Sequence, residues 1–355
     1  MDCPGEKLII KLWETLVEKG IGSLLTPGQI KREGRARNEV RRQELLILAQ
    51  AETDAAEIRA GRMRFDSNNG TLHQIKSVSE EIKFSRSSDL THDKSMLDFK
   101  SLTSVSKANK VAEAVRNEIN INKAIIYAEE RLASDSQLPP EDKIDDDWLF
   151  MWRDHAEKTS TEDLQKLWGA ILAGEIKSPG TYSLRTLDFL RRLSKSEAEK
   201  IAKLACFAIN DLLILITGDY LQNQGLSFRE LLKMQEIGVL SGIQTGNKPI
   251  IEYETTMPEV GQYIRPFCSN GKALIVKHDD PAKVLSLNVY LFTDVGAQLL
   301  KLGDFLPDIQ YLRLVGKYIV SQGFHVELAD WLEFPENSIA PGNFGRYINA
   351  EKIEA

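Results

Sequence analysis

Residues 162–193 read EDLQKLWGAILAGEIKSPGTYSLRTLDFLRRL, and this stretch decides the fold of the middle of the chain. Its first half carries apolar side chains at three- and four-residue spacing, the pattern of a helix with one buried face. These side chains are Leu164, Leu167, Trp168, Ile171 and Leu172. Gly174 is expected to end the helix, and Ser178-Pro179-Gly180 predicts a turn. The stretch therefore predicts two helices joined by a tight connection.

Capping residues predict where the helices of this region begin, because a side-chain oxygen accepts a hydrogen bond from a free amide in the first turn. The predicted caps are Ser160 with Asp163, Ser183, and Ser194 with Glu197. The last of these helices is expected to reach about Thr217. Upstream, the acidic residues 145–147 open a helix whose Trp148 faces the core. A compact helical bundle is predicted over 138–222.

The hydrophobic period changes after residue 222. Ser227 and Glu230 predict a short capped helix, and apolar or alternating runs at 250–255, 273–277 and 284–292 predict strands. Further helices are expected over 294–302 and from about 306 to 318, with a strand near 324–328 and an irregular tail. This order predicts a winged-helix-like α+β module over 223–355. The whole chain is accordingly expected to be mainly α.

The N-terminal helix is predicted to be amphipathic. Its apolar face contains Leu8, Leu12, Trp13 and Leu16, and lysines and glutamates fill the opposite face. Docking on the rest of the protein or on another subunit is the plainer interpretation. Lying on a membrane surface is the alternative, which the glutamates weaken because they repel anionic lipid.

The predicted organisation upstream of the bundle is a helical arm over 1–62, a flexible linker over 63–104 and a single helix over 105–137. The arm from residue 29 is rich in Ala, Glu and Arg and is expected to be solvated or coiled-coil-like. Its basic residues include Arg35, Arg41 and Arg42. The alternative is that these basic residues contact nucleic acid or lipid.

Composition places the chain in a reduced compartment. It has 355 residues, a net charge of -7 and only three cysteines, which are far apart and have no metal-finger spacing. The net negative charge argues against a non-specific nucleic-acid coat. No run of about 20 apolar residues is present, so no transmembrane segment is expected. A cytoplasmic location is predicted.

Motif searches predict no catalytic residues, no bound metal and no cofactor. Gly169 and Gly174 have phosphate-loop spacing, but Glu175 and Ile176 stand where that loop needs Lys and Ser or Thr. The five histidines are scattered, and neither an HExxH nor a GxSxG motif occurs. The acidic residues 145–147 with Asp154 and His155 are a weaker candidate for a metal-dependent hydrolase or nuclease. A helix-start role is the plainer reading of these acidic residues.

Arg229 and Lys233 lie on the predicted helix before the strands and are candidate nucleic-acid contacts. Neighbouring glutamates dilute their positive field, so a protein contact is the plainer alternative.

The sequence LPPEDKIDDDW (138–148), the stretch from Leu167 to Leu187 and LSKSEA (193–198) resemble a bacterial family catalogued as domain of unknown function 2806. The resemblance covers about 138–205 and implies no established activity. Its signature residues are Trp148, Trp168, Gly174 and Arg185. Arg185 is expected to pair with Glu175 or with the acidic residues 145–147, and contact with an anionic ligand is the alternative.

These features favour a non-enzymatic scaffold or regulatory protein that acts through protein contacts, as a homo-oligomer or with another partner. A nucleic-acid-binding regulator or phage-defence component is the first alternative. An unrecognised metal-dependent hydrolase or nuclease is the second.

Overall fold

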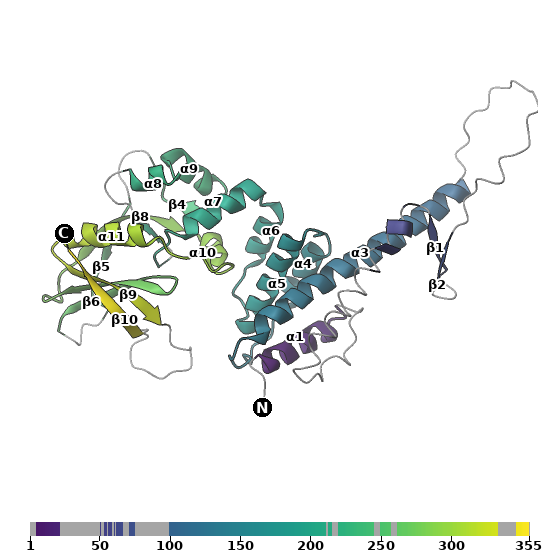
Figure 1. Ribbon diagram of the computed structural model, residues 1–355, viewed down its shortest axis with the longest axis horizontal. Coiled ribbons are helices and arrows are strands. Elements are labelled where there is room, and N and C mark those ends of the chain that lie inside the picture. The colour runs from purple at the N-terminus through teal and green to yellow at the C-terminus, as the bar shows by residue number, and fades with distance from the viewer. Residues whose placement is uncertain are drawn as a thin grey trace, which may run out of the picture. The chain divides into compact units, whose positions relative to one another are not determined.

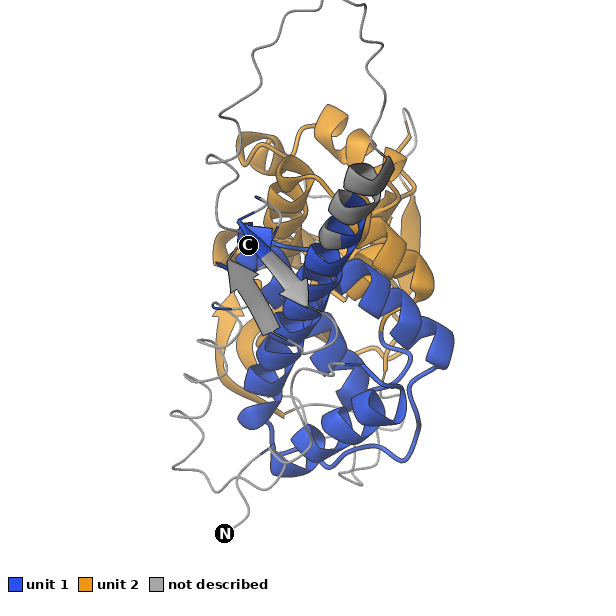
Figure 2. Cartoon of the chain, turned by 90° about the vertical axis from the view of Figure 1, so that its right-hand side faces the viewer, with its two compact units in different colours: residues 1–181 blue, residues 182–355 orange. Residues whose placement is uncertain are grey.

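The structure is a computed structural model that describes residues 5–21, 50, 53–54, 56–58, 60, 62–66, 71–74, 99–210, 212–214, 219–244, 249–256, 261–332 and 346–354. The chain forms two compact units, residues 1–181 and 182–355 (Figure 2). The helices on both sides of Pro140 pack on one another within the first unit.

The first unit is helical, with one hairpin (Figure 1). Its elements are α1 (Glu6–Glu18), β1 (Met63–Asp66), β2 (Thr71–Gln74), α3 (Phe99–Ala133), α4 (Asp146–Ala156) and α5 (Glu162–Lys177). The two strands pair antiparallel inside the region predicted as a linker. The same region contains the start of α3, which begins at Phe99 rather than near residue 105.

The longest helix, α3, packs along α5 and forms the centre of this unit. Gly169 permits the close approach, because a Cβ there would lie only 2.7 Å from the carbonyl oxygen of Ala124 and from Cβ of Tyr127. Trp152 of α4 is fully buried, and its indole Nε1 donates to the carbonyl oxygen of Trp168 in α5 at 2.9 Å. These contacts explain why the Trp-rich stretches of the sequence form one core.

The apolar face of α1 is part of that core. Leu8, Leu12 and Leu16 have no exposed surface, and Trp13 is 5% exposed, because α1 packs against α3 and α5. Lys11 on the other face donates to the carbonyl oxygen of Asp142 at 2.7 Å. In the structure the apolar face of α1 docks on other helices of the same chain. These four side chains are therefore buried within the first unit.

Most predicted caps are confirmed. Ser183 and Ser194 each accept a hydrogen bond from an amide three residues later, and Ser194 forms the expected capping box with Glu197. Asp145, which was not predicted as a cap, accepts a hydrogen bond from the Trp148 amide in the same way. The prediction for α5 is wrong: its N-cap position is Thr161 rather than Ser160, and the Thr161 side chain makes no capping hydrogen bond. The helix also continues past Gly174 to Lys177.

The second unit combines helices with two antiparallel sheets of four strands each. Its helices are α6 (Leu184–Arg192), α7 (Lys195–Ala205), α8 (Tyr220–Asn223), α9 (Phe228–Glu236), α10 (Asp294–Leu300) and α11 (Ile309–Ser321). Its strands are β3 (Leu212–Ile214), β4 (Leu240–Ser241), β5 (Ile250–Tyr253), β6 (Tyr263–Ser269), β7 (Lys272–His278), β8 (Leu285–Phe292), β9 (His325–Leu332) and β10 (Arg346–Ile353).

In one sheet the strands follow the order β10-β9-β7-β6, and α11 packs against β9, β10 and β7. In the other, β8 is central and pairs with β3, β4 and β5. The expectation of a mainly α protein is therefore wrong. The module predicted at 223–355 contains more sheet than expected, and it shares its unit with α6, α7 and β3.

The long helix predicted to reach Thr217 is the clearest local error. Helix α7 ends at Ala205, and Asn210 then adopts a left-handed φ of 48° in a turn closed by a hydrogen bond from the Leu212 amide to the Ile209 carbonyl, at 2.9 Å. The next residues form β3, whose three side chains are all buried. A short run of buried apolar residues has no period that separates a strand from a helix, which explains the error.

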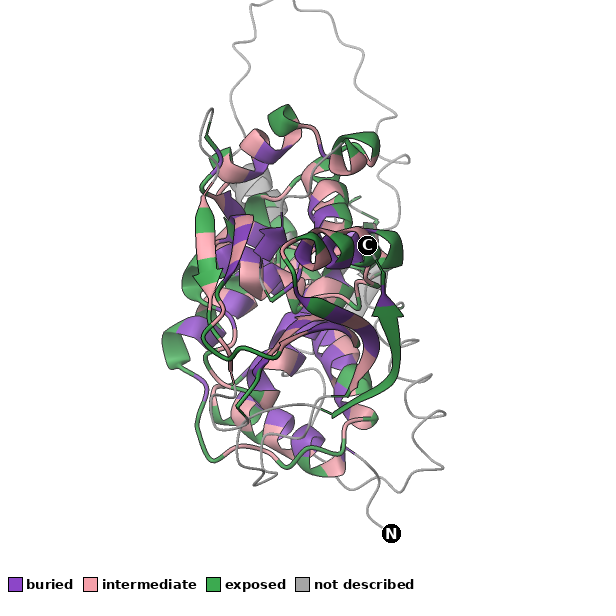
Figure 3. Ribbon diagram, turned by 90° about the vertical axis from the view of Figure 1, so that its left-hand side faces the viewer, coloured by how far each residue is buried: buried purple, intermediate pink, exposed green. Residues whose placement is uncertain are grey.

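Strand β10 was predicted as irregular tail. All its side chains except Ile353 are exposed, as Figure 3 shows, so it lacks the alternation that marks a half-buried strand. Its register against β9 shifts between Ile348 and Glu351, and Asn349 there has a φ of 55°. A bulge of this kind, together with charged side chains, discourages further pairing at a sheet edge.

Among the helices of the described ranges, none is long and apolar enough to cross a membrane.

Candidate binding pocket

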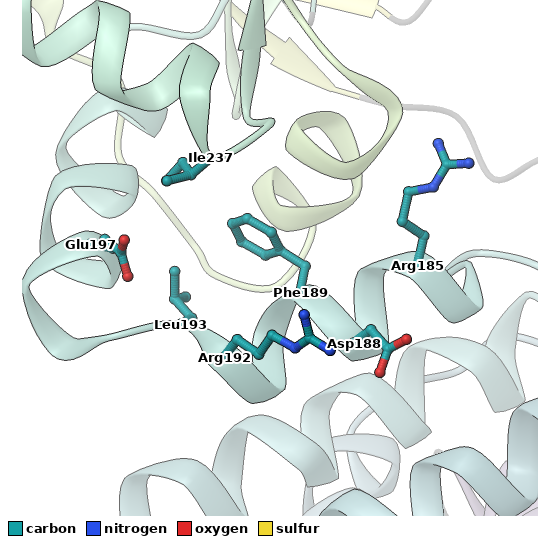
Figure 4. A pocket seen from close by; sticks show the side chains of 7 residues that line it. All are labelled: Arg185, Asp188, Phe189, Arg192, Leu193, Glu197 and Ile237. Atoms are coloured by element: carbon teal, nitrogen blue, oxygen red, sulfur yellow. The ribbon is translucent and has the colours of Figure 1, made fainter.

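A pocket of about 370 Å³ lies in the second unit, on one side of α6 (Figure 4). Its lining residues are Arg185, Asp188, Phe189, Arg192, Leu193, Glu197 and Ile237. Figure 4 shows Phe189 between Arg185 on one side and Leu193 with Glu197 on the other. The three apolar lining residues are half-buried, and the two arginines are exposed. We call this site the α6 pocket.

Helix α6 is held by its own cap and by α10. The Thr186 amide donates to Oγ of Ser183 at 3.3 Å, which begins the helix. Oε1 of Gln298 in α10 accepts hydrogen bonds from the Ser183 amide at 2.9 Å and from the Thr186 hydroxyl at 2.5 Å. Leu187 and Leu190 are buried on the same helix. With its inner face fixed in this way, α6 presents Arg185, Phe189 and Arg192 to the pocket.

The opposite wall is the C-terminal end of α9. Gly238 ends this helix in the left-handed conformation, with a φ of 87°, directly after Ile237. Thr293, the cap of α10, donates through its hydroxyl to the Gly238 carbonyl at 2.5 Å and through its amide to the Val239 carbonyl at 3.0 Å. The backbone directly after Ile237 is thus held by Thr293.

A charged cluster ties α9 to α7 next to the pocket. The Glu230 carboxylate accepts hydrogen bonds from Lys200 of α7 and, at 2.8 Å, from Lys233 of its own helix. Hydrogen bonds from Lys200 and then from Lys233 lower the pKa of Glu230 to about 2 from its ordinary value of 4.5. Opposite charges here link α7, which contributes Glu197 to the pocket, to α9, which ends at the lining residue Ile237.

The lowered pKa of Glu230 predicts a pH-dependent contribution to stability. A carboxylate with a depressed pKa in the folded state stabilises the protein above its unfolded pKa, and this contribution is lost as the pH falls from about 4.5 towards 2. Glu230→Gln should therefore be less stable than the wild type at neutral pH. In urea denaturation the difference should shrink steadily below about pH 4.5. An equal difference at pH 7 and at low pH would contradict this role.

The side chains that line the pocket are two arginines, two carboxylates and three apolar residues. Its lining has no serine, cysteine or histidine, so it offers no nucleophile–base pair. The carboxylate of Glu197 is engaged by its own helix cap, accepting from the Ser194 amide at 2.9 Å and from the Ser194 hydroxyl at 2.6 Å. These bonds lower the pKa of Glu197, which keeps it an anion rather than a proton donor. Arg185 and Arg192 offer fixed cations beside an apolar surface.

The structure places the predicted signature residues in different surroundings. Trp148 and Trp168 are buried in the first unit, and Gly174 lies inside α5. Arg185 belongs to the second unit and lines the α6 pocket. Its partners predicted in the first unit, Glu175 and the acidic residues 145–147, remain predictions. The alternative role, contact with an anionic ligand, agrees with its place in a pocket.

The candidate nucleic-acid contacts do not form one surface in the described residues. Arg229 is exposed on α9, whereas Lys233 is paired with Glu230. Arg35, Arg41 and Arg42 lie outside the described residues. The positive field of α9 is therefore partly cancelled, as the neighbouring glutamates suggested.

The acidic residues near His155 have structural tasks. Asp145 caps α4 by accepting from the Trp148 amide at 2.9 Å, and Asp146 forms an ion pair with Lys19 at 2.7 Å. His155 is buried, with its ring 5.4 Å from the ring of Trp168. Within the described ranges, no group of three or more His, Cys, Asp or Glu residues is placed to hold a metal ion.

Sequence reasoning missed Phe189, Arg192, Leu193 and Ile237 as functional candidates. A signal was present in the spacing Arg185, Phe189, Arg192, which puts three side chains on one side of a helix whose core face is Leu187 and Leu190. The end of α9 lies beside these residues only in the tertiary structure, and no local sequence pattern predicts this contact.

Comparison with protein families agrees with the expected resemblance. The model of a family described as "Protein of unknown function (DUF2806)" matches residues 107–315, which is more than half of the chain. The chain belongs to the DUF2806 family. The DUF2806 match includes α4, α5 and every residue of the α6 pocket, and extends well beyond the 138–205 signature. No curated protein and no solved structure matches the chain.

Proposed function

We propose that this DUF2806 protein is a non-enzymatic scaffold or regulatory protein that binds a protein partner through the α6 pocket. The observation that carries this proposal is the pairing of exposed guanidinium groups, Arg185 and Arg192, with a half-buried apolar surface made by Phe189, Leu193 and Ile237. Arginine and aromatic side chains are enriched at the energetic centres of protein interfaces.

The two alternatives have less support. A metal-dependent hydrolase would need the acidic residues of α4, but Asp145 is used as a helix cap and Asp146 as the ion-pair partner of Lys19. A nucleic-acid-binding regulator would need a basic face on α9, but Glu230 neutralises charge between Lys200 and Lys233. Homo-oligomer formation remains compatible with the proposal if a second copy supplies the bound segment.

The proposal is tested by selecting peptides from a displayed random library on the purified full-length protein. We expect enriched peptides to lose at least about 100-fold in affinity for the double variant Arg185→Glu and Arg192→Glu, because each of the two lost charge-assisted contacts costs roughly 1.5–3 kcal/mol. Fluorescence anisotropy of labelled peptides measures the loss.

Arg191→Glu is the matched control, since Arg191 is exposed on the same helix and does not line the pocket. It should bind the selected peptides like the wild type. If no selected peptide distinguishes the double variant from the Arg191 variant, the α6 pocket is not the binding site and the proposal fails.

A further inference from the structure

The two arginines of the α6 pocket are spaced in a way that selects the bound segment. Arg185 and Arg192 are seven residues apart. Seven residues are about two helical turns, so the two side chains leave α6 on the same side, about 10 Å apart along its axis. Phe189 follows Arg185 by four residues and precedes Arg192 by three, and therefore lies between them on that side. Along this side of α6 the order of residues is therefore Arg185, Phe189 and Arg192.

The two arginines of the pocket have more N–H donors than the carboxylates of the pocket can accept. Each guanidinium has five N–H donors, and a carboxylate accepts two of them in parallel. Asp188 is the nearest acceptor in sequence to both arginines, and the Glu197 carboxylate is turned to its cap on Ser194. One shared carboxylate can orient two guanidinium groups without saturating them. The remaining donors fit a ligand with two anionic groups.

The size of the pocket limits the shape of the ligand. A volume of about 370 Å³ is at the small end for ligand sites and accepts a few side chains rather than the 10–12 Å width of a helix. In an extended polyproline-II segment, residues i and i+3 lie on the same side about 9 Å apart, which is close to the rise along α6 between the Arg185 and Arg192 positions. The residue at i+1 lies on a neighbouring ridge and can reach Phe189, Leu193 and Ile237.

We infer that the α6 pocket recognises an extended segment of a partner protein with acidic residues at i and i+3 and a large apolar residue between them. This inference rests on the proposed function and specifies its ligand. Arg185 and Arg192 each hold one carboxylate, and the apolar residue covers Phe189.

The test uses a labelled peptide of sequence Gly-Gly-Glu-Leu-Pro-Glu-Gly-Gly, in which proline favours the extended conformation. Its control, Gly-Gly-Leu-Glu-Glu-Pro-Gly-Gly, has the same composition and charge with adjacent acids. We expect the first peptide to bind the full-length protein at least about tenfold more tightly than the control, with binding that weakens as salt is added. Equal affinities, or no binding by either peptide up to about 1 mM, would overturn the inference.

A charge swap separates recognition from damage to the fold. The Arg185→Glu and Arg192→Glu double variant should lose the acidic peptide and bind Gly-Gly-Lys-Leu-Pro-Lys-Gly-Gly instead, whereas Arg191→Glu should keep the wild-type preference. Loss of binding without the swapped preference would count against the inference. If the displayed library gives pocket-dependent peptides without acids at i and i+3, the inference fails while the proposed function stands. If it gives no pocket-dependent peptide, both fail.

Discussion

Replacing Trp152 by alanine should lower the free energy of unfolding by about 3–5 kcal/mol, the usual cost of removing a large aromatic side chain from a core. Trp152 has no exposed surface, and its indole donates to the Trp168 carbonyl at 2.9 Å. The substitution removes the packing between α4 and α5 and leaves that carbonyl without its indole donor. Urea denaturation followed by circular dichroism measures the loss.

Phe150→Ala is the control for this experiment. Phe150 lies two residues away on the same helix and is 45% exposed, so its loss should change the free energy of unfolding by no more than about 0.5 kcal/mol. Similar effects of the two substitutions would show that the α4–α5 contact is not the core of the first unit.

The second large effect is expected at Tyr311 in the second unit. Its ring is fully buried, with the Phe207 ring edge-on at 5.2 Å and the Tyr220 ring stacked at 6.5 Å between centroids. Its hydroxyl donates to the Ile214 carbonyl at 2.6 Å, and burial raises the pKa of Tyr311, so the hydroxyl stays a donor. Tyr311→Ala should cost about 3–5 kcal/mol of unfolding free energy in urea denaturation.

Tyr311→Phe separates the contribution of the ring packing from that of the hydrogen bond. It keeps the ring packing and removes only the hydrogen bond to Ile214, so its cost should be about 1–3 kcal/mol. If the phenylalanine variant were as unstable as the alanine variant, the hydrogen bond rather than the ring would carry the contact between α11 and β3.

The sequence predicted best those features that depend on a few neighbouring residues. A cap needs only a side-chain oxygen near an amide of the first helical turn, and Ser183, Ser194 and Ser227 all cap as expected. Strands β5, β7 and β8 lie within one or two residues of their predicted ends. These elements are decided locally, so a single sequence contains the information.

Features that depend on distant partners were not predictable in this way. Strand β3 is a strand because β8, more than 70 residues later, supplies its hydrogen bonds. Strand β10 likewise depends on β9 rather than on its own pattern. The same reasoning applies to the α6 pocket, where Ile237 is separated from α6 in the sequence by α7, β3, α8 and α9. The misjudged fold class follows from these missing strands.

The covering of the apolar face of α1 also depends on distant parts of the chain. This face was rightly recognised as a face that must be covered, but the sequence could not say by what. In the structure α3 and α5 cover it, which moves the candidate interaction surface of the protein from α1 to the α6 pocket.

The most direct test of that surface is amide hydrogen exchange of the full-length protein with and without a peptide selected from the displayed library. We predict slower exchange in α6 and around Ile237 when the peptide is bound, with unchanged exchange in α11 and β10. Protection confined to elements that do not line the pocket, or no protection at a saturating peptide concentration, would contradict binding at the α6 pocket.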